Sequence, residues 1–370
     1  MILKFAMLIV FFSVMIAIGF YCRKHATDVN GFVLGGRSVG PWLTAFAYGT
    51  SYFSAVIFVG YAGQFGWKYG IASTWIGIGN ALIGSMLAWV ILGRRTRIMT
   101  QHLNSATMPE FFGRRFHNDG LKLGASIIVF LFLIPYTASL YNGLSRLFGM
   151  AFNIDYTVCI IIMAVLTGVY VIAGGYMATA INDFLQGIIM LFGIATVILA
   201  VLKSNGGFLE ALNRLAMVSD QSVSAQPGVF ASFFGPDPLN LLGVVILTSL
   251  GTWGLPQMVQ KFYAIKSEKA ISKGTIISTL FAIIVSLYCI MAITTERAIN
   301  TTIRMRITKS CFFSSIFLMI CPFKKSMVKV ELEAMTREES VDMEADNTRM
   351  TTNPINAGER WEIIAGMMAS

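Results

Sequence analysis

The stretch FVLGGRSVGPWLTAFAYGTSYFSAVIFVGYAGQFGWKYG, residues 32–70, decides the fold of this chain. It joins a glycine-rich basic loop to an apolar segment that small and hydroxylated residues interrupt near its middle, at residues 49–54. A helix in lipid keeps its backbone hydrogen bonds within itself, and an interruption is tolerated only where protein, water or a ligand takes up the freed groups. The stretch therefore predicts a membrane helix that is broken to form a binding site.

Composition supports a membrane protein and argues against a soluble enzyme. The 370 residues are 55% hydrophobic and 13% charged, which leaves too few polar side chains to cover a water-facing surface. The net charge of +9 comes from Lys and Arg in short segments between apolar runs, so it indicates membrane topology rather than nucleic-acid binding. The five cysteines form no C-x-x-C pair, so neither a disulfide framework nor a zinc site is expected. No Walker A, H-E-x-x-H or G-x-S-x-G motif occurs, so enzymatic activity is not expected.

Apolar runs long enough to cross a bilayer, which takes about 20 helical residues, occur eight times. The expected spans are residues 5–22, 41–66, 71–93, 123–148, 156–173, 184–202, 239–260 and 275–293. Basic loop residues gather after spans one, three and seven, and they include Arg37, Arg94, Arg97, Lys261 and Lys266. By the positive-inside rule we expect an all-α, multi-pass protein of the plasma membrane with its N-terminus outside.

Two segments depart from the pattern of spans. Residues 204–238 carry glycines and prolines among polar residues, which predicts a long external loop. After about residue 293 the chain becomes polar and acidic without helical periodicity, so residues 294–370 are interpreted as a disordered or foreign tail. The multi-span domain is therefore expected over residues 1–293.

The interrupted segment of the second span could hold a cation. A glycine, hydroxyl-bearing side chains and aromatics replace the aliphatic residues of a lipid-facing helix there: Gly49, Thr50, Ser51, Tyr52, Phe53 and Ser54. Backbone carbonyls and Ser or Thr hydroxyls are the oxygen ligands that a hard cation such as sodium takes at a broken helix. Close helix packing through small residues is the alternative explanation.

The seventh span repeats this composition. It contains Thr248, Ser249, Gly251, Thr252, Trp253, Gly254 and Pro256. Proline removes an amide donor and glycine lowers helix propensity, so a second interruption is expected. Two broken helices at corresponding places in two halves of a chain indicate a binding site near the middle of the membrane, and a simple proline kink is the alternative.

A third candidate is Asp183, which follows the turn Ala173–Gly174–Gly175–Tyr176. A carboxylate inside a membrane costs roughly 2.5 to 3.5 kcal/mol on insertion scales, so its presence at the mouth of the sixth span suggests a role with a cation. The alternative is structural: Asn182 or Asp183 could cap free amides at the start of that helix.

Four segments in order resemble signatures of the sodium:solute symporter family. They are FVLGGRSVGPWLTAFAYGTSYFSA, TMPEFFGRRF, AGGYMATAINDFLQGIIMLFG and LGTWGLPQMVQKFYAI, and the likeness covers roughly residues 5–290. Members of that family include sodium/proline, sodium/pantothenate and sodium/sugar carriers. The resemblance implies a leucine-transporter-like bundle of two inverted five-helix repeats preceded by one extra helix.

The resemblance also implies roles for individual residues. Sodium would lie against the backbone carbonyls of Thr50 and Phe53, with Asp183 linked to sodium coupling. Arg37, in the GGRS run, resembles a loop arginine near the inner gate, although a charge that only sets topology is the alternative. The solute would be contacted from both broken helices by Ser51, Tyr52, Ser54, Thr252, Trp253 and Gln257.

The function implied is sodium-coupled symport of a small polar organic solute by alternating access. Its partners would be the solute, the sodium ion and the lipid bilayer, and no prosthetic group is needed. The alternative is a membrane sensor or a channel built on a symporter-like module. A sensor would need an attached signalling domain, and a channel would need a pore lined by rings of carbonyls or carboxylates.

The sequence also departs from the family pattern. Proline carriers have an acidic residue at the position of Tyr52, a tryptophan at Val56 and a tyrosine at Thr252, which argues against proline specificity. The family continues for several more helices, whose hydroxyls complete the sodium shell, and nothing after Ile293 resembles them. We therefore expect an incomplete second repeat and no transport by the chain as given.

Overall fold

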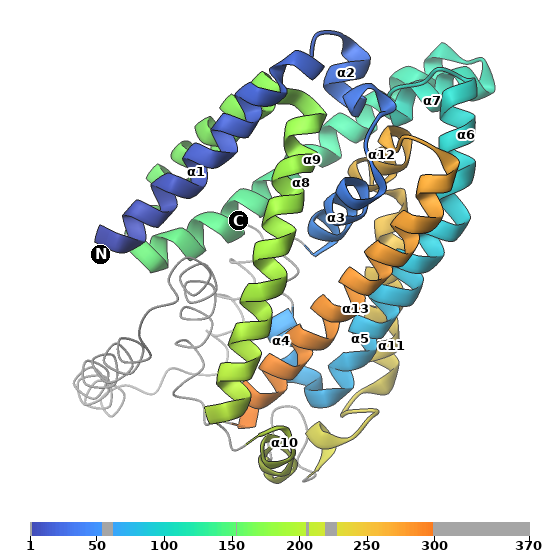
Figure 1. The fold of residues 1–370 in the computed structure, drawn as a ribbon. Coiled ribbons are helices and arrows are strands. Elements are labelled where there is room, and N and C mark those ends of the chain that lie inside the picture. Colours follow the sequence, from blue (N-terminus) through green and yellow to red (C-terminus); the bar gives the residue numbers. More distant parts are fainter. Residues whose placement is uncertain (1, 54–61, 153, 205–206, 219–227, 299–370) are drawn as a thin grey trace, which may run out of the picture. The chain divides into compact units, whose positions relative to one another are not determined.

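The computed structural model describes residues 2–53, 62–152, 154–204, 207–218 and 228–298. All of these residues belong to one compact unit, Met1–Ile320. Helices build this described part, apart from turns and one isolated β-bridge between Val39 and Ile265 (Figure 1). The expected all-α architecture is confirmed.

Helices follow the apolar runs of the sequence. In chain order the elements are α1 (Ile2–Cys22), η1 (Arg23–His25), α2 (Val29–Leu34), η2 (Gly35–Arg37), α3 (Pro41–Tyr52), α4 (Ala62–Tyr69), η4 (Gly70–Ser73), α5 (Thr74–Gly79), η5 (Asn80–Leu87), η6 (Trp89–Gly93), α6 (Arg94–His102), α7 (Met108–Phe116), α8 (Asp119–Phe152), α9 (Tyr156–Ser204), α10 (Phe208–Met217), η7 (Val229–Ala231), α11 (Pro238–Leu250), η8 (Gly251–Gly254), α12 (Pro256–Ala264) and α13 (Glu268–Ala298).

Several of these helices are long and apolar enough to cross a bilayer. Among the described residues there are 5 such helices, or 6 when the bent pair α11–α12 is counted as one span. One of the five, Tyr156–Thr196, contains a kink that divides it into two helices. The second predicted span, residues 41–66, includes residues 54–61, which lie outside the described part. The number of eight spans therefore stays a prediction.

Gly175 divides the 49-residue helix α9. Its φ of 56° and ψ of −149° belong to a region that is open almost only to glycine. A Cβ on Gly175 would also stand 2.8 Å from the carbonyl oxygen of Phe32 in α2. Figure 1 shows α9 turning beside α2, and the half that follows the turn then runs along α3. The turn expected between the fifth and sixth spans is therefore present.

Helix α3 lies at the centre of the main hydrophobic core. It packs against α9, α12 and α13, and every residue from Thr44 to Gly49 is buried. Aromatic rings fill the space around it: Tyr48 lies 5.6 Å from Trp89 and 5.7 Å from Phe262, measured between ring centroids. The core therefore holds in place the helix in which the sequence predicts a binding site.

The predicted external loop contains a helix. Residues Phe208–Met217 form α10, which packs on α13 and buries Ala211 and Leu215. Apolar residues at 208, 211, 212 and 215 follow helical spacing, so the segment can cover one apolar face although glycines and prolines surround it. The segment expected as an external loop over residues 204–238 thus contains ten helical residues, and its external position stays a prediction.

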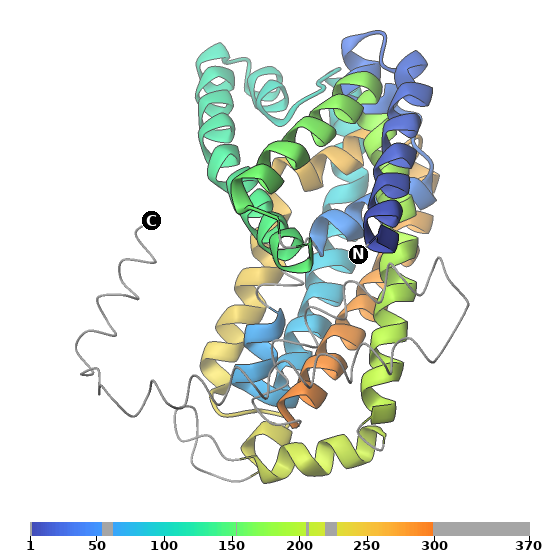
Figure 2. The same cartoon turned by 90° about the vertical axis from the view of Figure 1, so that its left-hand side faces the viewer.

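Three basic loops meet at the end of the unit where α2, α6 and α7 lie (Figures 1 and 2). The N–H of Val39 donates to the Ala264 carbonyl at 3.3 Å, and the N–H of Lys266 donates to the Val39 carbonyl at 2.9 Å. Arg97 was expected in the third loop but lies inside helix α6, and its Nε donates to the Ile265 carbonyl at 2.6 Å. The loops that the charge pattern assigns to one side of the membrane thus share one end of the structure.

Replacing Gly175 with alanine is expected to destabilise the protein. The strained φ and the contact with Phe32 should together cost about 1 to 3 kcal/mol, which would lower the unfolding temperature by several degrees in detergent. Gly168→Ala is the matched control, since it adds the same methyl group to α9 at a place with no atom within 4 Å. Equal unfolding temperatures for the two variants would contradict the assignment of the turn to Gly175.

Candidate functional site

The first break lies at the end of α3. The helix ends at Tyr52, and Phe53 leaves helical geometry with φ −91° and ψ 56°, although its N–H still donates to the Gly49 carbonyl at 2.9 Å. The last carbonyls of a helix have no partner within it, so the carbonyl groups of Thr50 and Phe53 stand where a helix end offers oxygens to another group. The sequence predicts sodium at this place.

Side chains at the first break add further oxygens. Thr50 and Ser51 are half-buried. The Thr50 hydroxyl donates to the Phe46 carbonyl at 2.9 Å, and its oxygen can still accept or bind a cation. Ser54, the remaining hydroxyl of the predicted set, lies outside the described residues.

The second break separates α11 from α12. Residues Gly251–Gly254 form the short turn η8, Leu255 is extended with φ −69° and ψ 124°, and Pro256 begins α12. The two helix axes differ by 53°. The helix is thus interrupted over a short segment rather than kinked at the proline alone, as the glycines and the missing amide of proline predict.

Tyr52 joins the two breaks. Its hydroxyl lies 3.1 Å from the Thr248 carbonyl in the last turn of α11 and 3.0 Å from Oδ1 of Asn80. Only 2% of Tyr52 is exposed, so both contacts lie inside the bundle. A hydroxyl donates a single hydrogen, which these two acceptors share. The structure therefore brings together interruptions that are far apart in the sequence.

The π-helix η5 packs against both breaks. The Ile83 carbonyl accepts a hydrogen bond from the Trp253 indole at 3.1 Å, and the Gly84 carbonyl accepts one from the Tyr48 hydroxyl at 3.0 Å. A π-helical turn shifts the backbone pairing by one residue, and such turns are frequent at functional sites. Here the shifted turn offers carbonyl oxygens to a side chain from each broken helix.

Asn80 is a residue of the site that sequence reasoning missed. It is 4% exposed, and its Oδ1 accepts from Tyr52 and, at 3.1 Å, from the Ser249 hydroxyl. A lone amide in an otherwise apolar span is costly in a membrane unless it is bonded, and its position in the third predicted span was the signal that could have identified it.

The three solute contacts predicted in the second broken helix differ in what they can still bind. The Thr252 hydroxyl donates to the Ser249 carbonyl at 3.1 Å, and the Trp253 N–H is taken by Ile83. Gln257 has both amide atoms buried with no hydrogen-bond partner among the described residues. A buried amide without a partner costs free energy, so binding of a polar ligand to Gln257 would be favourable.

Asp183 lies in α9 and pairs with Lys261 in α12. The distance from Lys261 Nζ to Asp183 Oδ2 is 3.4 Å, and the side chains are 8% and 24% exposed, respectively. The assignment of Lys261 to a loop was wrong, because it lies inside α12 and is buried. The capping alternative for Asn182 and Asp183 was also wrong: the Asn182 amide has no partner among the described residues, and Asp183 bonds Lys261.

Asp183 and Thr50 lie on neighbouring helices at different levels. A Cβ on Gly187 would come within 2.6 Å of Phe46 and 3.1 Å of Thr50, so Gly187 packs directly against α3. Asp183 precedes Gly187 by one turn, which corresponds to about 6 Å along the helix axis. Asp183 therefore stands about one turn away from Thr50.

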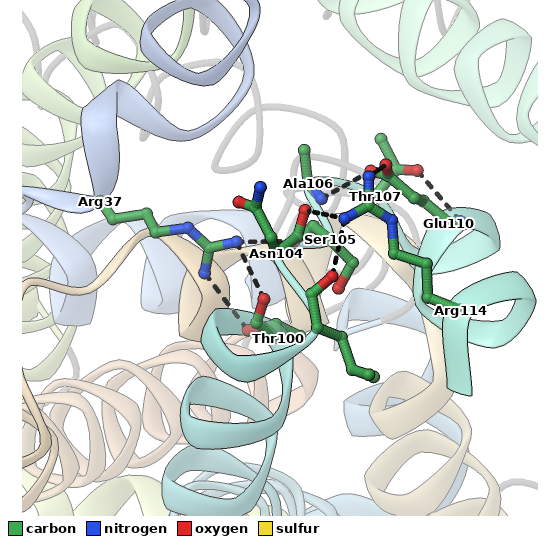
Figure 3. A network of polar contacts seen from close by, with 9 residues as sticks. Arg37, Thr100, Asn104, Ser105, Ala106, Thr107, Glu110 and Arg114 are labelled. Carbon is green, nitrogen blue, oxygen red and sulfur yellow. Dashed lines mark hydrogen bonds and ion pairs between the residues drawn. The ribbon is translucent and has the colours of Figure 1, made fainter.

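Arg37 binds the last turn of α6 and the loop that follows it (Figure 3). Its guanidinium donates to the Thr100 carbonyl at 3.2 Å, the Ser105 carbonyl at 2.7 Å and the Thr100 hydroxyl at 3.4 Å. Burial, followed by the charge of Arg97, lowers the pKa of Arg37, but arginine remains protonated in proteins. Arg37 is thus a bonded, charged tie between two loops rather than a free loop charge.

The PEFFGRRF segment completes the same network. The Thr107 side chain caps α7 by accepting from the Glu110 N–H at 3.3 Å, and Glu110 Oε2 accepts from the Ala106 N–H at 2.8 Å. Arg114 pairs with Glu110 and donates to the Leu103 carbonyl at 2.7 Å (Figure 3). These hydrogen bonds stabilise the loop after α6, to which Arg37 donates at Ser105.

The amino-acid sequence of this chain is similar to those of known proteins. The model of the sodium:solute symporter family matches residues 32–310. The chain is 31% identical over 277 residues to sodium/proline symporter 2 of Staphylococcus saprophyticus, covering 73% of this chain and 52% of that protein. It is 33% identical over 277 residues to the sodium/proline symporter of Staphylococcus aureus strain JH9, covering 73% of this chain and 51% of that protein. The chain thus spans about half the length of these curated relatives.

A comparison of structures agrees on the fold. The substrate-bound, outward-open structure of a sodium-coupled sialic acid symporter matches with a TM-score of 0.67 at 17% sequence identity. The match covers 85% of this chain and 68% of that one. The chain therefore has the leucine-transporter-like bundle implied by its sequence motifs, and it is a multi-pass membrane protein.

Replacing Tyr52 with phenylalanine removes the hydroxyl that joins the two breaks. The loss should cost about 1 kcal/mol, because the Thr248 carbonyl and Asn80 Oδ1 lose the one hydrogen that they share. The unfolding temperature in detergent should fall. Tyr21→Phe is the control, since Tyr21 is 66% exposed and keeps its ring beneath Lys24. A loss no larger than that of the control would contradict the bridging role.

Replacing Arg37 with lysine keeps the charge but removes the planar fork that reaches Thr100 and Ser105. A hydrogen bond from a charged group is worth about 1.5 to 3 kcal/mol, so amide hydrogen exchange in residues 100–107 should speed up about tenfold or more. Hydrogen-exchange mass spectrometry would measure this. The exposed Arg95→Lys should leave that exchange unchanged, and equal exchange in both variants would argue against the tie.

Proposed function

This chain belongs to the sodium:solute symporter family, and from that premise we propose that it couples sodium to the movement of a small polar organic solute by alternating access. Membership indicates a transporter rather than an enzyme. Because the curated relatives are about twice as long, the activity is proposed for the protein as a whole.

The contact between the two breaks is the observation that supports this proposal most directly. Tyr52 holds the end of α3 against the last turn of α11, so both interruptions share one region of the bundle. Broken helices that meet in this way present carbonyls and helix ends to a ligand without exposing them to lipid. Packing through small residues alone would give no reason to interrupt both helices.

We assign the coupling ion to the first break and its surroundings. Sodium would contact the carbonyls of Thr50 and Phe53 and, about one turn away, the Asp183 carboxylate. Movement of one positive charge inward through 100 mV provides about 2.3 kcal/mol, enough to concentrate a neutral solute roughly fortyfold. Sodium is therefore a sufficient energy source, and no further cofactor is invoked.

We assign the solute to the space between the two breaks. Ser51, Tyr52 and Ser54 would face it from the first, and Thr252, Trp253 and Gln257 from the second. The unpaired amide of Gln257 favours a solute with both donors and acceptors, such as a zwitterion. Two of the relatives are sodium/proline symporters, which makes proline the first solute to test.

Arg37 is proposed to close the inner side of the pathway. It ties the loop before α3 to the loop after α6, and both loops lie at the basic end of the unit. By the positive-inside rule this end faces the cytoplasm, the N-terminus lies outside, and the plasma membrane is the expected location.

Sodium should stabilise the purified protein, and a solute should add to that only when sodium is present. The test is thermal unfolding in detergent with NaCl or choline chloride at equal ionic strength, with proline and other small polar solutes. An unfolding temperature that does not distinguish sodium from choline would count against the proposed sodium site. Uptake into proteoliposomes under a sodium gradient examines the whole transport cycle.

A further inference from the structure

We propose that Lys261 is a built-in cation that competes with sodium for the carboxylate of Asp183, so that sodium binding releases α12 from α9. The inference rests on the proposed sodium coupling and adds to it a second residue that sets the sodium affinity. It assigns to Lys261 a role in coupling the ion to the movement of a broken helix.

The pair is close enough to neutralise its charges and loose enough to exchange. The separation of 3.4 Å exceeds the roughly 2.7 to 2.9 Å of a strong ammonium–carboxylate hydrogen bond. Lys261 is almost completely enclosed, whereas Asp183 keeps 24% of its side-chain surface accessible. Asp183 is therefore the more accessible partner of the pair, as the proposed exchange with a small cation requires.

One further oxygen near the pair, the Tyr176 hydroxyl, can take part in the exchange. The Lys261 ammonium lies 5.2 Å from the centre of the Tyr176 ring, and the Tyr176 hydroxyl is buried with no partner among the described residues. Sodium prefers oxygen ligands, and an unbonded buried hydroxyl on a ring next to Lys261 is available to it. The ring face also stabilises an ammonium that has left the carboxylate, through a cation–π contact.

The two partners belong to elements that can move relative to each other. Asp183 lies in the half of α9 that follows Gly175, while Lys261 lies in α12 directly beyond the 53° bend at η8. Because the bend separates α12 from α11, the ion pair is a side-chain tie between α12 and the α9 helix that packs along α3. Exchange of lysine for sodium loosens this tie while the carboxylate stays neutralised.

The test compares sodium titrations of variants by thermal unfolding in detergent, with choline chloride replacing sodium chloride. Lys261→Met removes the competing charge, so the sodium concentration for half-maximal stabilisation should fall about tenfold, the change expected if the lysine contact is worth about 1.4 kcal/mol. Lys261→Arg keeps a cation and should stay within about twofold of the unchanged protein. Lys266→Met, an exposed lysine nearby, controls for loss of charge and should have no effect.

A second measurement uses the unchanged chain and does not depend on the folding of a variant. Sodium should free the Lys261 ammonium, so acetylation of Lys261 by acetic anhydride, followed by mass spectrometry, should speed up severalfold in sodium relative to choline. The exposed Lys266 should react at the same rate in both salts.

The outcomes separate the inference from the proposed function. A sodium response with the same midpoint in Lys261→Met and in the unchanged protein, or Lys261 acetylation that ignores sodium, would overturn the competition and leave sodium coupling intact. A response that appears only in Lys261→Met would support the competition. The absence of any sodium effect in either protein, including on acetylation, would overturn both ideas.

Discussion

Backbone N–H and C=O groups inside a bilayer need hydrogen-bond partners, and the rest of this structure depends on that requirement. Two helices stop inside the bundle, and the hydroxyl of Tyr52 connects the ends that result, through the Thr248 carbonyl and Asn80. The π-helix η5 supplies further carbonyls, at Ile83 and Gly84, to side chains of both broken helices. Protein atoms thus stabilise both interruptions inside the bundle, and the carbonyl oxygens at the end of α3 are those to which we propose that an ion binds.

At the basic end of the unit, charged side chains likewise find hydrogen-bond partners. Arg37 and Arg97 place their guanidinium groups on backbone carbonyls of neighbouring loops, at Ser105 and Ile265, so that positive charge neutralises loop dipoles instead of standing free. The residues that would orient the protein in a membrane therefore also hold its loops together. The Asp183–Lys261 pair repeats the arrangement deeper in the bundle, where a carboxylate takes the place of the carbonyl.

Local sequence predicted much of this fold. Glycine, proline and hydroxyl-rich composition located both breaks, and the AGGY run located the turn at Gly175, because these residues act on their own backbone. The partner of Asp183 was not predictable in the same way, since Lys261 is 78 positions away and looked like one loop charge among several. The π-helix around Asn80 was missed because its amide is matched by Tyr52 and Ser249, contacts that form only after the helices pack.

The β-bridge between Val39 and Ile265 couples the movement of α12 to that of α3. Helix α12 has nine residues and is about 13 Å long. It begins after the turn η8, and the residue that follows its last turn, Ile265, pairs with Val39 in the segment that leads into α3. A swing of about 10° would carry the end of α12 about 2 Å, farther than the Val39–Lys266 hydrogen bond can stretch, so α3 must follow or the bridge must break. Such a coupling would transmit any tilt of one helix to the other without a ligand spanning the distance.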